Sequence, residues 1–223
     1  MKIVHAIRQF WPGIGGMEDV ALQLARQQVR AGHEVSVVTL DRIFDDPDAQ
    51  VLPAEDQVDG ILIRRIPFAG SRRYPLCPSI AGLLKKADIV HVHGVDFIFD
   101  WLAFTQPFHG RKLVLSTHGG FFHTGFASGL KKLWFATITR LALTRYAAVF
   151  ASSPTDEARF REIRARGIRT IENGVRMDKF AGCADPASRN MIYFGRLAPN
   201  KNLPRLIRWF AAVAASDPSW RLV

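Results

Sequence analysis

Short apolar runs alternate along the chain with longer segments in which apolar residues recur every three or four positions. The first run, 2–7, leads into the glycine-rich loop 13–16, after which apolar residues spaced four apart predict a helix. Gly32 stands where helices commonly end, and a second apolar run follows over 34–40. This order of strand, glycine turn, helix and strand predicts the opening of a doubly wound parallel sheet, whose ligands bind at the carboxyl ends of the strands.

The same alternation continues through the rest of the chain. The segment 41–59 is acidic, has no strong period and is predicted to be a loop. Ser153 is a candidate N-cap for the helix that follows it. Further strands are predicted over 61–66, 88–94, 112–117, 147–152 and 169–171, and further helices over 81–86, 130–146 and 154–166.

The chain is predicted to hold two Rossmann-like α/β domains, the second one incomplete. The segment 173–189 has no clear period and contains glycine and proline, which predicts a linker between a first domain, 1–172, and a second, 190–223. The second domain starts with a strand over 191–194 and a helix over 202–215, and another strand begins after them. One strand and one helix cannot close a core, so this part is expected to be a fragment or to pack on the first domain.

The composition of the 223 residues is that of a folded protein, with 48% hydrophobic and 22% charged residues. No uninterrupted apolar stretch has the length of a membrane-spanning helix, and the first apolar run is too short for a secretory signal. We therefore expect a cytoplasmic location. Cys77 and Cys183 are far apart and lack metal-ligand spacing, which favours reduced, structural thiols.

The formal net charge of +10 predicts an anionic partner. No nucleic-acid-binding signature accompanies this charge, so no nucleic acid is expected and an anionic membrane surface is the stronger candidate. The predicted helix 130–146 favours the membrane because it joins basic and aromatic side chains, as helices on anionic headgroups do. Its candidate membrane residues are Lys131, Lys132, Trp134 and Phe135, and Arg64, Arg65, Arg72 and Arg73 are expected in an exposed basic segment beside Tyr74.

Two strand-turn-helix junctions have the composition of phosphate sites. Arg196 and Lys201 stand before a helix start, whose free N–H groups carry partial positive charge and favour a diphosphate. Gly15 and Gly16 would let a ligand approach the backbone at the start of another helix. A solvated basic loop and a tight turn without a ligand are the alternatives. Asp41 also resembles the ribose-binding acid of a nicotinamide-dependent oxidoreductase, although the glycine spacing departs from that fingerprint.

Three histidines, His91, His93 and His118, fall at or near the ends of neighbouring predicted strands. A zinc site would use such residues, but the sequence has no His-Glu-x-x-His helix or supporting carboxylate spacing, so no metal is expected. The Asp-x-Asp pair at 46–48 lies in a polar stretch with proline, which favours a solvated loop over a metal site. His118 is the candidate catalytic residue because its strand end coincides with the glycine loop.

Five separated motifs occur in the order that they have in one enzyme family. They are Gly15–Glu18, Thr117–Gly120, Ala151–Pro154, Ile171–Val175, and Gly195–Leu197 with Lys201 and Asn202. The chain thus resembles the retaining glycosyltransferases of family 4, whose GT-B fold has two Rossmann-like domains. The run 119–124 is most similar to α-mannosyltransferases that extend polyprenyl-diphosphate-linked saccharides in acetan- and xanthan-type exopolysaccharide synthesis.

This resemblance implies a donor, an acceptor and a role for each motif. Arg196 and Lys201, together with the glycine loop, would bind the diphosphate of a nucleotide sugar. In the α-mannosyltransferases that the run 119–124 resembles, this donor would be GDP-mannose. The charge of Arg196 and Lys201 would stabilise the leaving nucleoside diphosphate, so no metal or other cofactor is implied. The acceptor would be a polyprenyl-diphosphate-linked saccharide at the inner face of the plasma membrane. The resemblance also places His118 against the transferred sugar, and Gly15 and Gly16 near the donor diphosphate or the acceptor. The cleft residues that it implies are Glu18, Ser153 and Asn173, the last at the interdomain hinge.

One departure from the family pattern concerns the donor. The Glu-x7-Glu segment that holds the donor sugar and ribose belongs to a later part of the second domain and does not occur in these 223 residues. We therefore expect this chain alone to transfer sugar very poorly or not at all. Two alternatives stay open: a non-catalytic module that binds a membrane surface or the acceptor, and the oxidoreductase that Asp41 would serve.

Overall fold

The computed structural model describes residues 1–13, 15–44, 50–72, 74–119, 128–174, 181–183, 185, 187–195, 197 and 201–223. The chain separates into two compact units, Met1–Gly174 and Val175–Val223, and the strands of each unit pair only with one another. The assignment of an acceptor role to the first unit and a donor role to the second stays a prediction.

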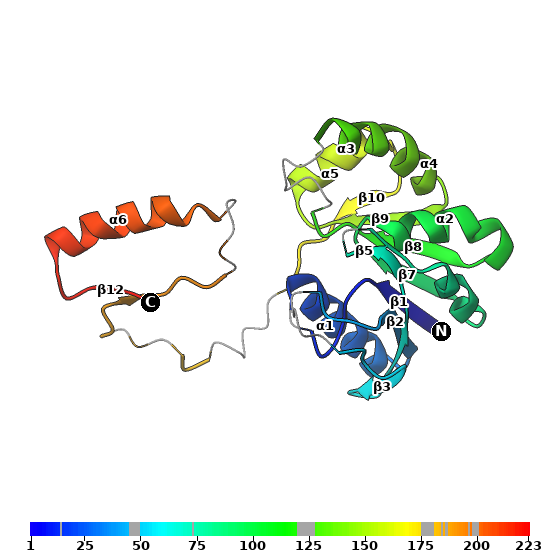
Figure 1. Ribbon diagram of the computed structural model, residues 1–223, viewed down its shortest axis with the longest axis horizontal. Helices are drawn as coiled ribbons and strands as arrows, with labels where there is room; N and C mark the ends of the chain where they lie inside the picture. Colours follow the sequence, from blue (N-terminus) through cyan, green and yellow to red (C-terminus); the bar gives the residue numbers. More distant parts are fainter. Residues whose placement is uncertain are drawn as a thin grey trace. The chain divides into compact units, whose positions relative to one another are not determined.

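An eight-stranded sheet forms the centre of the first unit (Figure 1). Its order is β10-β9-β8-β7-β1-β2-β4-β3, and every neighbouring pair is parallel except β3 with β4. The predicted α/β fold with a doubly wound parallel sheet is therefore confirmed. The strands are β1 (Lys2–Ile7), β2 (Glu34–Leu40), β3 (Glu55–Val58), β4 (Ile61–Ile66), β7 (Ile89–His93), β8 (Lys112–Ser116), β9 (Tyr146–Ala151) and β10 (Ile168–Thr170), and β5 (Ala69–Ser71) pairs separately with β6 (Tyr74–Leu76).

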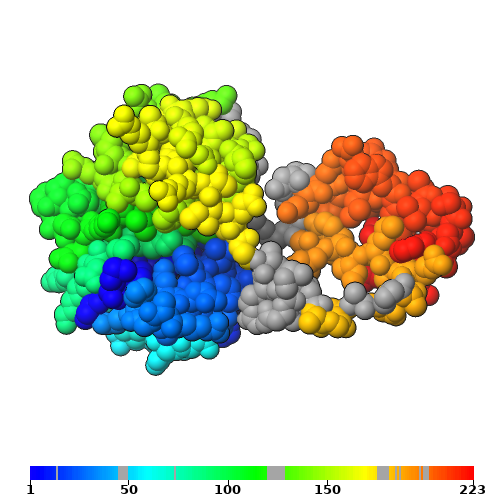
Figure 2. Space-filling view, turned by 180° about the vertical axis from the view of Figure 1, so that it is seen from behind, coloured from blue at the N-terminus to red at the C-terminus, as the bar shows by residue number. Residues whose placement is uncertain are grey.

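Helices cover the sheet on both faces. Figure 1 shows α1 beside β1 and β2, and α3, α4 and α5 grouped on the side of β9 and β10. The space-filling view shows α1, in blue, and the segment of α5 and β10, in yellow, at the surface of this unit (Figure 2). The helices are α1 (Gly16–Arg30), η1 (Pro78–Leu84), α2 (Phe97–His109), α3 (Ser128–Trp134), η2 (Phe135–Thr139, a π-helical stretch), α4 (Arg140–Leu143) and α5 (Pro154–Arg161).

Alternate residues of the central strands point into two separate cores. On β1, Val4 and Ala6 belong to the larger core, which includes residues of α2, α4 and α5. Ile7 belongs to the smaller core, which includes Ala21 and Ala25 of α1. His5 alternates with Val4 and Ala6 and is fully buried, so a polar ring lies on the α1 side of the sheet.

The order of the strands reverses between β1 and β7. Chain connections proceed from β1 to β2 on one side and from β7 to β8 on the other, so the crossing helices leave a crevice at the carboxyl ends of these strands. Four loops meet the sheet at this edge. They are the turn before α1, the segment from Gly94 to Asp96, the segment from Thr117 to Gly119, and Ser152 with Ser153.

The second unit is a β-α-β element. Strand β11 (Asn190–Met191) pairs in parallel with β12 (Arg221–Leu222), and α6 (Leu203–Ser216) connects them. Strand β11 is shorter than the strand predicted over 191–194, whereas the helix agrees with its predicted range. The backbone of Asn202, directly before α6, is left-handed with a φ of 49°.

The structure corrects three expectations about the elements and the basic segment of the first unit. Helix α2 was not predicted, and β3 occupies part of the segment that was predicted to be a loop. Arg65 was expected to be exposed, but its side chain is fully buried and donates hydrogen bonds to the carbonyl oxygens of Trp11 and Pro53 at 2.7 and 3.0 Å. A salt bridge of 2.9 Å to Asp56 compensates its charge.

None of the helices in the described ranges combines the length and the apolar character that crossing a lipid bilayer requires.

Candidate active site

The loops at the carboxyl edge of the sheet are bound to one another through the backbone. Gly94, after β7, donates its N–H to the carbonyl of Ser116 on β8 at 2.8 Å. Its φ is +83°, and a side chain on Gly94 would lie 3.4 Å from Sδ of Met17 in α1. The left-handed backbone conformation therefore favours glycine here, while the distance to Met17 is that of an ordinary van der Waals contact. These contacts bring the loops after β1, β7 and β8 together.

His118 lies two residues beyond the end of β8, in a left-handed backbone conformation with a φ of 49°. A non-glycine residue adopts this conformation at a cost, and such strain is concentrated at functional sites. Burial lowers the pKa of His118 to about 4, although the nearby carboxylate of Asp156 opposes this shift. The ring is therefore neutral at pH 7. Its Nε2 lies 3.0 Å from Nδ1 of His93.

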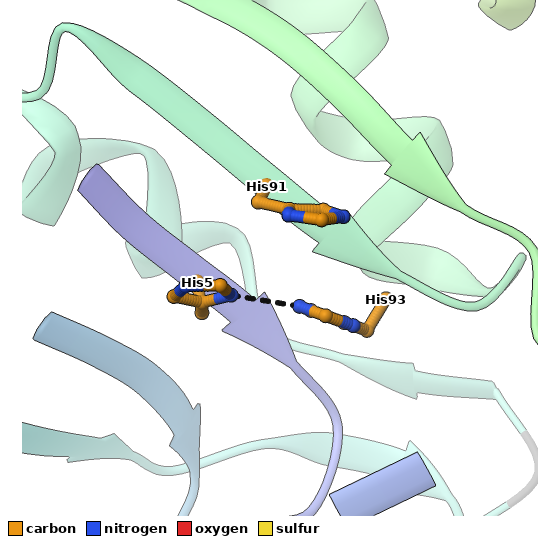
Figure 3. A group of neighbouring side chains, drawn as sticks. All are labelled: His5, His91 and His93. Carbon is orange, nitrogen blue, oxygen red and sulfur yellow. Dashed lines mark hydrogen bonds between the residues drawn. The ribbon is translucent and has the colours of Figure 1, made fainter. Parts of the chain in front are cut away.

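His93 belongs to a group of three buried histidines on the α1 side of the sheet (Figure 3). His5 of β1 lies beside both His91 and His93 of β7, and its Nδ1 is 2.8 Å from Nε2 of His93. The second nitrogen of His5 lies 2.7 Å from Oε1 of Gln28 on α1. His91 stacks on both rings and pairs through Nε2 with the Ser116 hydroxyl at 2.7 Å.

The geometry of this histidine group does not fit a metal ion. The rings are nearly parallel, with interplanar angles of 18° to 28° and centroids 4.4 to 5.3 Å apart. A metal must lie in the plane of each ligating ring, about 2 Å from its nitrogen, which stacked rings cannot satisfy together. The nitrogens of His5 that face Gln28 and His93 are also already hydrogen-bonded. The prediction that no metal is required stays a prediction for the whole site.

Asp156 holds two of the strand-end loops together, and sequence reasoning did not single it out. Its buried carboxylate accepts a short hydrogen bond from the Thr117 hydroxyl, and it also accepts the backbone N–H of Ser152 at 3.2 Å. Thr117 immediately precedes His118, so this carboxylate fixes the loop that carries the candidate catalytic residue.

Ser153 has a structural role in addition to any contact with a ligand. Its hydroxyl oxygen accepts the backbone N–H of Asp156 at 3.1 Å, which makes it the N-cap of α5, as the sequence predicted. Asn173 is exposed and lies outside regular structure near the end of the first unit. Neither position is brought against His118 by a contact that the structure records.

Gly15 and Glu18 are in contact with each other. Gly15 is the N-cap of α1, and a side chain placed on it would meet Oε2 of Glu18 at 2.2 Å. Glu18 occupies the third helical position, from which a carboxylate can fold back over the cap. Both residues line a small pocket of about 70 Å³ with Phe10 and Trp11. Gly16 has open space around it, so the close packing explains only Gly15.

The predicted diphosphate cations belong to the second unit. Lys201 is exposed directly before Asn202 and α6. Arg196 lies outside the described residues, as do Gly120, Arg73 and the Asp-x-Asp pair at 46–48. The proposed roles of Arg196 and Lys201 stay predictions.

A second pocket, which sequence reasoning missed, opens beside α2 and α3. It has a volume of about 290 Å³, and at its wall Oδ2 of Asp100 accepts hydrogen bonds from Tyr74 Oη at 2.8 Å and Trp134 Nε1 at 3.2 Å. Burial raises the pKa of Asp100 to about 6. The pocket is lined by Tyr74, Val95, Asp96, Asp100, Leu130, Lys131 and Trp134.

The helix predicted over 130–146 is present as α3, η2 and α4, but one of its four candidate membrane residues is buried. Phe135 is only 5% exposed and packs edge-on against Phe160 in the larger core, so its assignment to a membrane surface is wrong. Lys132 is exposed, while Lys131 and Trp134 line the pocket of Asp100. The π-helical turn at Phe135 shifts which side chains of the continuous helix face the core.

The chain matches the family model of Glycosyltransferase Family 4 over residues 14–179. Along its full length it is similar to proteins named GDP-mannose:cellobiosyl-diphosphopolyprenol alpha-mannosyltransferase. It is 50% identical to the one from Xanthomonas oryzae pv. oryzae (strain PXO99A), 48% to that of Xanthomonas campestris and 40% to that of Komagataeibacter xylinus. The chain spans 59% of the length of the first two and 57% of the third.

Solved structures of glycosyltransferases have a similar fold at low sequence identity. The catalytic domain of Starch Synthase IV from Arabidopsis thaliana, bound to ADP and acarbose, aligns with a TM-score of 0.64 at 15% identity and covers 99% of this chain and 67% of its own. An alpha-glucosyltransferase in complex with UDP aligns with a TM-score of 0.57 at 14% identity, covering 92% and 53%. These likenesses concern the fold alone, and they confirm the predicted GT-B class.

Proposed function

This chain belongs to glycosyltransferase family 4, and from that premise we propose that the protein transfers a mannosyl group from GDP-mannose to a polyprenyl-diphosphate-linked saccharide. The observation that carries this proposal is the identity of 40% to 50%, along the entire chain, to relatives whose names state this donor and a cellobiosyl-diphosphopolyprenol acceptor. Retention of the anomeric configuration follows the family resemblance. The nicotinamide-dependent alternative draws no support from these matches.

The first unit has the features of a sugar-binding edge. A neutral imidazole, His118, is held in a strained loop at the switch point of a parallel sheet, where ligands of such sheets bind. A neutral ring can exchange hydrogen bonds with sugar hydroxyls without attracting the diphosphate away from its cations. We assign His118 to the transferred sugar, and Glu18, Ser153 and Asn173 to the surrounding cleft.

The donor diphosphate is assigned to Arg196 and Lys201 of the second unit. Gly15 and Gly16 of the first unit are assigned to phosphate binding through the backbone. Negative charge develops on the nucleoside diphosphate as it leaves, so fixed cations stabilise the transition state more than the ground state. The reaction then has no need of a metal ion. This part of the proposal rests on the motif and on the exposed position of Lys201 before α6.

The acceptor is lipid-linked, and we propose that α3, η2 and α4 rest on an anionic membrane surface. Leu130 and Leu141 are 64% and 70% exposed, and Leu133 and Ile138 extend the same stripe of the helix. Exposed apolar stripes of this size usually mark an interaction surface. Basic side chains flank the stripe, namely Lys131, Lys132, Arg140 and Arg145.

The test of the donor site is calorimetric titration of this chain with GDP-mannose, UDP-glucose and GDP. Binding of GDP-mannose should weaken in Lys201→Ala and Arg196→Ala by about 1.5–3 kcal/mol, the range for hydrogen bonds to charged groups. Lys85→Ala, an exposed lysine of the first unit, is the matched control and should bind as the parent does. If all three variants bind GDP-mannose with the same affinity, the assignment of Arg196 and Lys201 to the donor site is refuted.

The test of the reaction is transfer of labelled mannose from GDP-mannose to an extracted lipid-linked saccharide. It should be made with this chain and with a form extended to the length of its relatives. Transfer by the extended form, lost in His118→Ala, supports the proposal. Binding of acceptor lipid without transfer by either form would favour the non-catalytic module instead.

A further inference from the structure

A continuous line of hydrogen-bonded groups leads from the surface of α1 to His118. Oε1 of Gln28 lies 2.7 Å from Nε2 of His5, whose Nδ1 lies 2.8 Å from Nε2 of His93. Nδ1 of His93 then lies 3.0 Å from Nε2 of His118. The line crosses from β1 to β7 at the switch point of the sheet, and Figure 3 shows the contact between His5 and His93.

The hydrogen bonds of this line all donate in one direction, from His118 toward Gln28. A carbonyl oxygen only accepts hydrogen bonds, so Nε2 of His5 must carry a proton to pair with Gln28. A neutral imidazole carries one proton, which makes Nδ1 of His5 an acceptor and requires a proton on Nε2 of His93. Because His93 is also neutral and its proton is on Nε2, its Nδ1 is an acceptor, and this requires a proton on Nε2 of His118. Each link fixes the next because each ring has one donor and one acceptor.

The rings remain neutral at physiological pH, so each has one donor and one acceptor nitrogen. Burial lowers the pKa of His5 and of His118 to about 4, and it lowers those of His91 and His93 well below the ordinary value. A second positive charge in the group would also be repelled by the first, because the rings are stacked within 5.3 Å of one another.

We propose that Gln28, His5 and His93 are positioning residues that hold His118 in the Nε2-protonated tautomer, so that its Nδ1 faces the ligand side as a hydrogen-bond acceptor. The chemical partner of that nitrogen is a group that donates a proton, such as a sugar hydroxyl. The identity of the ligand rests on the proposed function, whereas the tautomer rests only on the geometry of the hydrogen-bonded line.

The proposal also explains the pattern of polar residues in the α1 side of the sheet. His5 and His93 are buried, and each lies in register with an apolar residue on one side, Val37 for His5 and Ile7 for His93. Buried polar groups are costly unless they are paired. His91 differs from them because it stacks on the line but pairs with Ser116 instead of joining it. It is therefore a natural control residue for the effect of removing a buried ring.

The test exchanges the group that ends the line at Gln28, which is only partly buried. Glutamate at this position can only accept and lysine can only donate, so the two changes should impose opposite directions on the same rings. The readout is the ¹⁵N spectrum of labelled histidine rings in this chain at pH 7.5, which distinguishes protonated from unprotonated nitrogens. His118 signals are assigned by their loss in His118→Ala.

The parent and Gln28→Glu should show His118 with the proton on Nε2, and Gln28→Lys should move it to Nδ1. His91→Phe should leave the His118 tautomer as in the parent, whereas His5→Phe should mix the two forms. The same His118 tautomer in Gln28→Glu and Gln28→Lys would overturn the proposal, and so would a proton on Nδ1 in the parent. If His5→Phe does not fold, the comparison of Gln28→Glu with Gln28→Lys still tests what sets the His118 tautomer.

An activity measurement on the extended form separates this proposal from the proposed function. Gln28→Lys should lower kcat for mannosyl transfer by roughly tenfold, because Nδ1 of His118 then carries a proton and can no longer accept a hydrogen bond from the ligand. Gln28→Glu should retain the kcat of the parent. Absence of transfer in every form, with the spectra as expected, would refute the proposed function and leave the tautomer assignment intact.

Discussion

The buried carboxylate of Asp156 accepts a hydrogen bond from the hydroxyl of Thr117, although the two residues are 39 positions apart in the chain. The same carboxylate accepts the N–H of Ser152, and the N–H of Asp156 is bound by the Ser153 cap. One aspartate thus ties the loop after β8 to the turn between β9 and α5. His118 follows Thr117 directly, so its strained backbone conformation depends on this tie.

Replacing Asp156 by alanine should destabilise the first unit and loosen His118. The change removes the acceptor of the partly buried Ser152 N–H and leaves the buried Thr117 hydroxyl with only its 3.4 Å contact to the Phe150 carbonyl. This costs about 1–3 kcal/mol of unfolding free energy. Urea denaturation measures this loss. Glu162→Ala removes an exposed carboxylate at the end of the same helix and should change the unfolding free energy by less than about 0.5 kcal/mol. Equal effects of the two changes would mean that the hydrogen bonds of Asp156 do not stabilise the first unit.

The buried histidines should make the protein sensitive to acid. Burial lowers the pKa of His5 from 6.5 to about 4, so between these values the unfolded chain binds a proton that the native protein does not. The free energy of unfolding therefore falls as the pH is lowered from 6.5 to 4, by about 3 kcal/mol for His5 alone. His91, His93 and His118 act in the same direction. Denaturation midpoints measured from pH 7.5 to 4.5 report this fall.

The same pH range contains two opposing groups. Burial raises the pKa values of Asp96 and Asp100, so these carboxyls take up protons in the native protein first and stabilise it as the pH falls. His5→Phe removes one histidine and neither carboxyl, so it should flatten the dependence of stability on pH. A slope unchanged by His5→Phe would contradict the assignment of acid sensitivity to this group.

Tyr74→Phe should raise the pKa of Asp100 above its present value of about 6. The Tyr74 hydroxyl donates to the carboxylate, which stabilises the charged form and partly offsets the effect of burial. Titration of the Asp100 carboxyl carbon by NMR gives the midpoint directly. Tyr193→Phe, in the second unit, is the matched control and should leave that midpoint in place. A midpoint that falls in Tyr74→Phe would contradict the hydrogen bond as the cause.

Much of the fold could be predicted from periodicity, and the exceptions have physical reasons. The unit from β1 to β2 was predictable because its glycine turn, amphipathic helix and helix-ending Gly32 agree with one another. Helix α2 was missed because it is mostly apolar and aromatic and contains Pro107, which hides its period. Its boundaries were nevertheless readable, since Asp96 caps its start and Gly110 ends it in a left-handed conformation.

The candidate site was predictable only where a local motif carried it. His118 and Ser153 lie in short motifs, and Ser153 forms the cap that its position suggested. His5 was missed because its partner His93 is 88 residues away, and only the sheet order makes β1 and β7 neighbours. The exposure of Arg65 was predicted wrongly because its partners Trp11, Pro53 and Asp56 lie elsewhere in the chain and only the fold brings them to its side chain.

Leu133→Glu should weaken binding to anionic vesicles. Leu133 is 61% exposed in the stripe formed by α3, η2 and α4, and Phe104 and Phe108 of the neighbouring α2 are also exposed. Glutamate removes the apolar contribution of one leucine, about 1–2 kcal/mol, and adds repulsion from anionic lipid of about 1 kcal/mol. Partitioning between buffer and vesicles of mixed phosphatidylglycerol and phosphatidylcholine should therefore fall by about 30-fold to 150-fold, because about 1.4 kcal/mol corresponds to a factor of ten.

Val51→Glu is the matched control for this change, because Val51 is a similarly exposed apolar residue outside the stripe. It alters the net charge by the same amount, so an effect of overall charge would reduce vesicle binding in both variants equally. Lys132→Glu should weaken binding through charge alone, and high salt should abolish its difference from the parent while leaving that of Leu133→Glu. Loss of binding in Val51→Glu as large as in Leu133→Glu would move the membrane contact away from α3 and α4, and the exposed stripe would then need another partner.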